Sequence, residues 1–284
     1  MNTPLYKALI QHARRNSHSF HVPGHHNGDV FFDDAKSIFD PLLTIDVTEL
    51  AGLDDLHHPS GVIKEAQELV SQLYGSAESF FLVNGTTVGN LAMILSVCEP
   101  GDTILVQRNC HKSVFHAVDL VPVLSRFILH LTLIQRCMCL RMFRLEQLKR
   151  LWQRYPDAKG LVLTNPTYYG HSADLTEIIT EAHHYGIPVL VDEAHGAHFI
   201  LGEPFPVSAL KMGADIVVQS THKTPPAMTM GSYLHLNTSR RINRDRVAEY
   251  LNRLQSGGPV LSDYGFVRYC PRLCTAYYRR TKAF

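Results

Sequence analysis

The sequence predicts an α/β protein with a mostly parallel β-sheet and helices on both faces of that sheet. Six short runs are rich in Val, Ile, Leu and Phe without polar alternation, which is typical of strands buried on both faces. Helix-like stretches separate several of these runs, and repeated strand–helix–strand units favour parallel pairing. The predicted strands are 79–83, 103–107, 160–164, 187–191, 215–219 and 232–236. The predicted helices include 87–97, 145–154 and 175–185.

The composition is that of an ordinary globular protein. The 284 residues suffice for one large α/β domain and a smaller piece, and 45% of them are hydrophobic while 19% are charged. A formal net charge of +1 gives no electrostatic reason to expect nucleic acid or a membrane as a partner. The six cysteines show no repeated CxxC spacing, and the N-terminus shows no signal-peptide pattern. We therefore expect reduced thiols and a cytoplasmic protein.

Polar, turn-forming clusters follow five of the predicted strands. They occupy 84–90, 108–113, 165–170, 192–195 and 220–223. In open α/β sheets, ligands bind just beyond the carboxyl ends of the strands. The sequence therefore predicts one ligand site at this edge of the sheet.

The first cluster has features that suit a phosphate group. Asn84-Gly85-Thr86-Thr87 opens a predicted helix, so free backbone N–H groups and two hydroxyls lie together. An ordinary helix N-cap explains the same letters equally well. The chain contains no GxxxxGK[ST] pattern, which excludes a P-loop.

Asp192 and Lys223 are the strongest candidates for chemistry. Asp192 directly follows the apolar run 187–191, where a buried carboxylate needs a compensating partner such as a protonated pyridine nitrogen. A carboxylate that caps the next turn is the structural alternative. Lys223 follows the next predicted strand, and a lysine amine whose charge is suppressed forms Schiff bases. Asp192 and Lys223 would then flank one planar ligand.

Three histidines and a serine belong to the same clusters. Ser220 and His222 precede Lys223 and can add hydrogen bonds to the phosphate, while His111 offers a flat ring that can stack on a planar ligand. His195 is a further cofactor-binding candidate from the cluster of Asp192. A surface or capping role is the alternative for His111. Although the chain has 17 histidines, HExxH and the usual metal-ligand spacings do not occur, so we predict no metal.

Together these segments resemble the ornithine/lysine/arginine decarboxylase family, whose members are fold-type I enzymes that depend on pyridoxal 5'-phosphate (PLP). The matching segments are 20–25, 54–59, 84–87, 109–113, 192–198 and 220–224, in the order of the family. The run Met230-Gly231-Ser232 is similar to the shorter branch of the family.

The resemblance implies roles for individual residues. Lys223 would form the Schiff base with PLP, Asp192 would pair with the pyridine nitrogen, and His111 would stack on the ring. The phosphate would be held by Thr86, Thr87, Ser220 and His222. The implied reaction is decarboxylation of arginine, lysine or ornithine to agmatine or a diamine plus carbon dioxide, in a homodimer with the site at the interface.

The resemblance also implies a domain division. We expect an N-terminal arm over 1–60, a PLP-binding major domain over 61–240, and the start of a truncated C-terminal region over 241–284. The family's small C-terminal domain would be missing.

Two stretches depart from the family pattern. Residues 120–145 contain no Asp, Glu or Gly, and the only acid in 257–284 is Asp263. We interpret both as out-of-frame translations, and we expect the sheet to lack a strand over the first stretch.

Two alternatives to an active decarboxylase remain open at this point. One is a non-catalytic remnant that still binds PLP. The other is a different fold-type I activity, such as an aldolase or an aminotransferase, built on the same Lys223 and Asp192.

Overall fold

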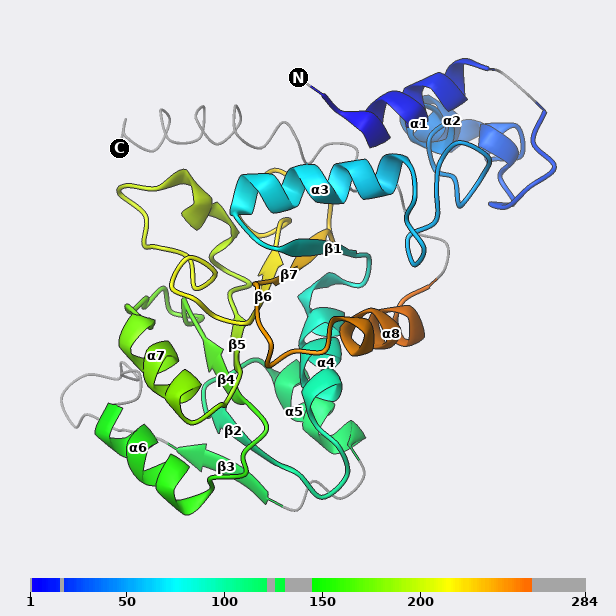
Figure 1. The fold of residues 1–284 in the computed structure, drawn as a ribbon. Coiled ribbons are helices and arrows are strands. Elements are labelled where there is room, and N and C mark those ends of the chain that lie inside the picture. The colour runs from blue at the N-terminus through cyan, green and yellow to red at the C-terminus, as the bar shows by residue number, and fades with distance from the viewer. Residues whose placement is uncertain (1, 16–17, 122–125, 131–144, 257–284) are drawn as a thin grey trace.

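The described part of the chain is organised around one seven-stranded sheet. The computed structural model describes residues 2–15, 18–121, 126–130 and 145–256. The strand order is β1-β7-β6-β5-β4-β2-β3, with β3, β2, β4, β5 and β6 parallel and β7 antiparallel to both β6 and β1 (Figure 1). The strands are β1 (Glu78–Leu82), β2 (Thr103–Gln107), β3 (Arg126–His130), β4 (Leu161–Thr164), β5 (Val189–Asp192), β6 (Ile216–Ser220) and β7 (Ser232–Leu236). The predicted α/β class and mostly parallel sheet are confirmed.

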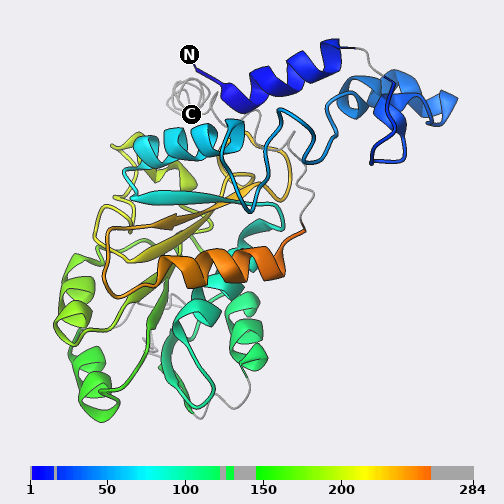
Figure 2. The same cartoon turned by 45° about the vertical axis from the view of Figure 1, so that its right-hand side comes forward.

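Helices cover both faces of the sheet (Figure 2). One buried cluster joins the sheet to α1, α3, α6 and α7, and the other joins its opposite face to α4, α5 and α8. The α-helices are α1 (Pro4–Arg14), α2 (Asp33–Leu43), α3 (Val62–Tyr74), α4 (Gly85–Val97), α5 (Lys112–Leu120), α6 (Leu145–Arg154), α7 (Thr176–His184) and α8 (Arg244–Leu254). Two short 3-10 helices are η1 (His26–Gly28) and η2 (Ala197–Leu201). No helix in these described ranges is long and apolar enough to cross a bilayer.

The expectation of a missing strand within 120–145 is wrong. Strand β3 lies at the edge of the sheet and pairs in parallel with β2, from Thr103 opposite Arg126 to Gln107 opposite His130. An edge strand needs only a short run with β-propensity, and Phe127-Ile128-Leu129 provides one even though the surrounding stretch lacks acids and glycines. Residues 131–144 and 257–284, on which the rest of the out-of-frame hypothesis depends, lie outside the described residues.

The N-terminal residues divide into two parts. Leu5 and Leu9 of α1 are buried together with Val70 of α3, in the core on the face of the sheet that α6 and α7 also cover. The segment containing η1 and α2 projects away from the sheet (Figure 2). Phe32 and Ile38 of this segment are 79% and 71% exposed. Residues 1–60 thus contribute to the main core only in part.

Close packing of α4 against the sheet depends on Gly89. A Cβ atom at this position would lie 2.5 Å from Val218 Cγ1 and 2.7 Å from Leu82 Cδ1. Real Cβ atoms do not approach carbon this closely, so α4 would have to move outward if the residue were larger. This contact fixes the distance between the start of α4 and the carboxyl end of β6.

We expect Gly89→Ala to destabilise the protein by about 1–3 kcal/mol, because the new methyl group overpacks the α4–β6 contact. Urea unfolding followed by circular dichroism measures the change. Gly160→Ala is the matched control, since the nearest atoms to its new methyl group are 3.6 Å away. Equal stability of the two variants would contradict the packing argument.

Candidate active site

The polar clusters predicted from the sequence converge on one cavity at the carboxyl edge of the sheet. The cavity has a volume of about 630 Å³ and lies between the ends of β4, β5 and β6 and the first turn of α4. All eight predicted site residues line it: Thr86, Thr87, His111, Asp192, His195, Ser220, His222 and Lys223. Strands β5 and β6 are neighbours, so the predicted single crossover between Asp192 and Lys223 is confirmed.

Asp192 is a buried carboxylate with neutral partners. Its side chain is 3% exposed, Asn90 Nδ2 donates to Oδ2 at 2.8 Å, and the Ala194 N–H donates to Oδ1 at 3.1 Å. Within the described residues, no Lys, Arg or His side chain forms an ion pair with it. A buried charge without a counter-charge is costly, so the site fits a cationic group on a ligand.

The amine of Lys223 lies beside an imidazole. Its Nζ is 3.2 Å from His195 Nε2. Although much of the Lys223 side chain is open to solvent, partial burial in the cavity lowers the pKa of the amine, and the negative charge of Asp192 opposes this shift. Burial and the nearby Lys223 lower the pKa of His195 in turn. A neutral His195 Nε2 can therefore accept a hydrogen bond from Nζ.

The start of α4 combines backbone and hydroxyl groups that suit a phosphate. Gly85 adopts a φ of +69°, which favours glycine, and opens the helix at the cavity. The Thr86 hydroxyl is in contact with the buried Ser220 hydroxyl at the end of β6. His222, two residues after Ser220, donates from Nδ1 to the Gly231 carbonyl at 2.9 Å, which fixes its ring. Helix N–H groups, two hydroxyls and an imidazole therefore surround one end of the cavity.

His111 is held as a wall of the cavity. Its Nδ1 lies 2.8 Å from Ser113 Oγ and accepts from the Ser113 N–H, so the ring caps the start of α5. Partial burial is the main cause that lowers its pKa; the negative charge of Asp192 opposes this shift, and the positive charge of Lys223 adds to it. A neutral, fixed ring is suited to stacking on a flat ligand. The capping alternative is thus observed, and it leaves the ring at the cavity, where the predicted stacking on a planar ligand stays a prediction.

Two polar groups of the site were not singled out from the sequence. Asn90 orients Asp192 and also donates to Ser113 Oγ at 2.9 Å. Thr164 ends β4 opposite Asp192 in the register. In the described part of the chain, Asn90 Oδ1 and Thr164 Oγ1 are buried without a hydrogen-bond partner. The signal for Asn90 is a lone amide within the apolar helix α4. Such orphaned groups in a cavity wall favour a polar ligand.

Two motifs from the sequence lie outside this cavity. Asp54 Oδ2 accepts the backbone N–H groups of Gly61 at 2.7 Å and Ile63 at 3.0 Å, so it caps the start of α3. Desolvation raises the pKa of Asp54, but hydrogen bonds from several backbone N–H groups, including those of Ser60 and Gly61, together lower it below its usual value. His25 Nε2 lies 3.2 Å from Asp46 Oδ2 in the N-terminal segment. Both segments serve local structure within this chain.

The comparison with protein families decides the classification. The family described as Orn/Lys/Arg decarboxylase, major domain, matches residues 3–264. This chain belongs to the Orn/Lys/Arg decarboxylase family. Its fold is also similar to that of lysine decarboxylase A from Pseudomonas aeruginosa, with a TM-score of 0.78 and 22% identity over 92% of this chain and 39% of that chain.

Relatives of this decarboxylase family are found in bacilli. The chain is 85% identical over 266 residues to the uncharacterized protein YaaO of Bacillus subtilis strain 168, covering 91% of this chain and 54% of that relative. It is 42% identical over 235 residues to an arginine decarboxylase of Bacillus anthracis, covering 82% of this chain and 48% of that relative. The chain thus spans about half the length of the curated relatives it matches.

We expect Asp192→Asn to lower the pH at which Lys223 becomes reactive, because the carboxylate raises the pKa of the amine. Acetylation of the protein at a series of pH values, followed by peptide mass spectrometry, gives the midpoint for each lysine. Lys36 on α2 is a remote control whose midpoint stays constant. A midpoint for Lys223 that stays the same or rises in the variant would refute the electrostatic coupling of Asp192 and Lys223.

Proposed function

We propose that this chain provides the PLP-binding site of a decarboxylase that converts a basic amino acid (arginine, lysine or ornithine) to its amine and carbon dioxide. The observation that carries the proposal is the convergence of Asp192 and Lys223 from adjacent strands on one cavity. Membership of the Orn/Lys/Arg decarboxylase family supports the same reaction.

The residues of the cavity fit PLP. The buried anion of Asp192 would hold the protonated ring nitrogen, and the amine of Lys223, whose pKa is lowered by burial, would bond to the aldehyde carbon. His111 would stack on the ring, and His195 would lie at the lysine end. The phosphate would be held by Thr86 and Thr87 at the start of α4 and by Ser220 and His222 at the end of β6. When bound, PLP supplies an electron sink for cleavage of the bond between the α-carbon and the carboxylate.

The chain's own groups would control charge and protons around that chemistry. Asp192 stays fixed by Asn90 and the Ala194 N–H, so its charge faces the cavity without rearrangement. The lowered pKa of Lys223 favours its neutral amine, and His195 Nε2 at 3.2 Å is placed to accept a hydrogen bond from Nζ. Orientation of the substrate's carboxylate selects decarboxylation among the reactions open to an amino acid.

We further propose that the chain forms a homodimer. The partner in the reaction would be a small molecule, the amino acid substrate. The exposed apolar side chains of α2 and the preceding loop support a self-association surface, with Phe32 at 79% and Ile38 at 71% exposure. Burial of such apolar surface against a second copy of the chain would stabilise a dimer. No charge excess of the chain calls for a nucleic acid partner.

Incubation of the protein with PLP and each of arginine, lysine and ornithine tests the reaction. We expect one of the three to yield agmatine or a diamine, identified by mass. Lys223→Ala should abolish both product and the PLP adduct that borohydride fixes on the protein, whereas Lys112→Ala at the same cavity should retain the adduct. An adduct that persists in Lys223→Ala would show that the wrong lysine is assigned. An adduct without product would favour a PLP-binding protein, and a keto acid product an aminotransferase.

Light scattering tests the dimer. We expect the wild-type mass to be twice that of one chain and the double variant Phe32→Glu/Ile38→Glu to be monomeric, because two charges interrupt the apolar surface. Val207→Glu, at an exposed position outside this segment, should remain dimeric. A monomeric wild-type protein would refute the proposal.

A further inference from the structure

A buried line of hydrogen bonds ends at a carboxylate that the proposed reaction does not use. Glu193 directly follows Asp192, and successive side chains of an extended chain point to opposite faces. Whereas Asp192 contacts Asn90 of α4, Glu193 is fully buried and contacts Gln219 of β6. Gln219 Nε2 and Ser208 Oγ donate to Glu193 Oε2, each at 2.6 Å, and the Ala209 N–H donates to Oε1 at 2.7 Å.

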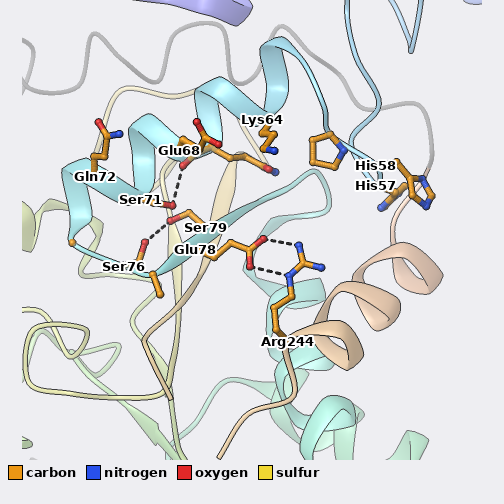
Figure 3. Close-up of a pocket in the computed structure, with 14 residues that line it drawn as sticks. His57, His58, Lys64, Glu68, Ser71, Gln72, Ser76, Glu78, Ser79 and Arg244 are labelled. Carbon is orange, nitrogen blue, oxygen red and sulfur yellow. Dashed lines mark hydrogen bonds and ion pairs between the residues drawn. The ribbon is translucent and has the colours of Figure 1, made fainter. Parts of the chain in front are cut away.

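The line continues across the sheet to the outer edge of β1. Because the Gln219 amide donates to Glu193, its Oε1 accepts from His235 Nε2 at 3.2 Å. Nδ1 of the same ring then accepts from Ser79 Oγ at 2.8 Å. Burial lowers the pKa of His235 to about 3, so its ring is neutral. Ser79 lies 2.7 Å from Ser76 in a second cavity of about 860 Å³, beside the ion pair of Glu78 and Arg244 (Figure 3).

The direction of these hydrogen bonds favours an ionised Glu193. Every link donates toward the carboxylate, and its three direct neighbours are all donors. A carboxylate is an acceptor only, so it satisfies all three donors at once, whereas an added proton would require the Ser208 hydroxyl or the Gln219 amide to reorient. The ionised form is therefore the one that the hydrogen-bond network fits.

The Glu193 side chain packs directly against the backbone at Gly196, where a larger residue would collide with it. A Cβ atom on Gly196 would lie 2.6 Å from Glu193 Cγ and 3.0 Å from Phe199 Cε2. The Gly196 N–H also donates to the Glu193 carbonyl at 2.8 Å. The Glu193 N–H in turn donates to the Val218 carbonyl at 2.9 Å, which extends the pairing of β5 with β6 past Asp192. Glu193 is thus anchored through both backbone and side chain.

Electrostatics connect Glu193 to the site. Burial is the largest cause that raises its pKa, to about 7, and the negative charge of Asp192 acts in the same direction, while the three hydrogen bonds oppose the rise. The neighbours from the other elements, Ser208, Ala209 and Gln219, are neutral, and so is His235 one link farther. The charge of Glu193 therefore acts mainly on Asp192 behind the cavity.

We propose that Glu193 is a positioning residue of the site, which anchors the carboxyl end of β5 and adds a second negative charge behind Asp192, so that Asp192 holds the cationic ring nitrogen of PLP more strongly. This inference rests on the proposed function. It assigns to Glu193 an indirect role, since its carboxylate faces away from the cavity and touches neither PLP nor substrate.

Equilibrium dialysis against PLP at pH 6 and pH 8.5 tests the proposal. Glu193 gains its charge between these pH values. From pH 6 to pH 8.5, the affinity of the wild type for PLP should therefore increase by a factor about three- to tenfold larger than the increase in Glu193→Gln. The double variant Glu193→Gln/Gln219→Glu is the matched control. It exchanges the two side chains, so that an amide and a carboxylate still form a hydrogen bond, but the charge now lies on β6. We expect it to recover thermal stability without recovering the extra pH-dependent gain in affinity.

Unfolding without PLP gives a second readout. The folded-state pKa of Glu193 is raised above its ordinary value of 4.5, so the wild type should lose stability relative to Glu193→Gln as pH rises from 4.5 to about 7. If PLP affinity has the same pH dependence in the wild type and in Glu193→Gln, this inference is wrong but the proposed function still stands. The same holds if the double variant Glu193→Gln/Gln219→Glu recovers the full pH-dependent gain in affinity. A wild-type protein that binds no PLP would overturn the proposed function and the inference with it.

Discussion

Asp192 is buried at the carboxyl end of β5, and its two hydrogen-bond partners, Asn90 and the Ala194 N–H, are neutral. A charge in this position destabilises the fold unless something compensates it. The rest of the site is arranged around that constraint. Lys223 approaches from the neighbouring strand, and α4 supplies both Asn90 and the backbone N–H groups of its first turn. The fold thus keeps an anion that a cationic ligand would satisfy.

The two faces of the sheet contribute differently to this anion. On one face, α4 packs closely against β6 through Gly89 and brings Asn90 within 2.8 Å of the carboxylate. On the other face, Glu193 ends a line of donors that begins at the edge of β1. Two consecutive residues are therefore held from opposite faces of the sheet: Asp192 by Asn90 and Glu193 by Gln219. Precise placement of a buried charge is the contribution that a rigid, preorganised site makes to catalysis.

Much of this arrangement could be predicted from the sequence, because apolar strands and the polar clusters at their ends are local patterns. The eight candidate residues fall into one cavity for that reason. Strand order is not a local pattern, so the contacts of Glu193 with Gln219 and of His235 with Ser79 could not be read from their separate positions. Strand β3 is hidden at the sequence level because its short apolar run lies within a stretch whose composition, without acids or glycines, is unlike that of a folded domain.

The most direct test of the account compares PLP with its 1-deaza analogue, in which a carbon replaces the ring nitrogen and no positive charge can form. If Asp192 holds a cationic nitrogen, the wild-type protein will bind PLP more tightly than the analogue, and Asp192→Asn will lose that preference. Equal affinity of the wild-type protein for the two compounds would contradict the account, because the buried carboxylate would then have no part in recognising the ring.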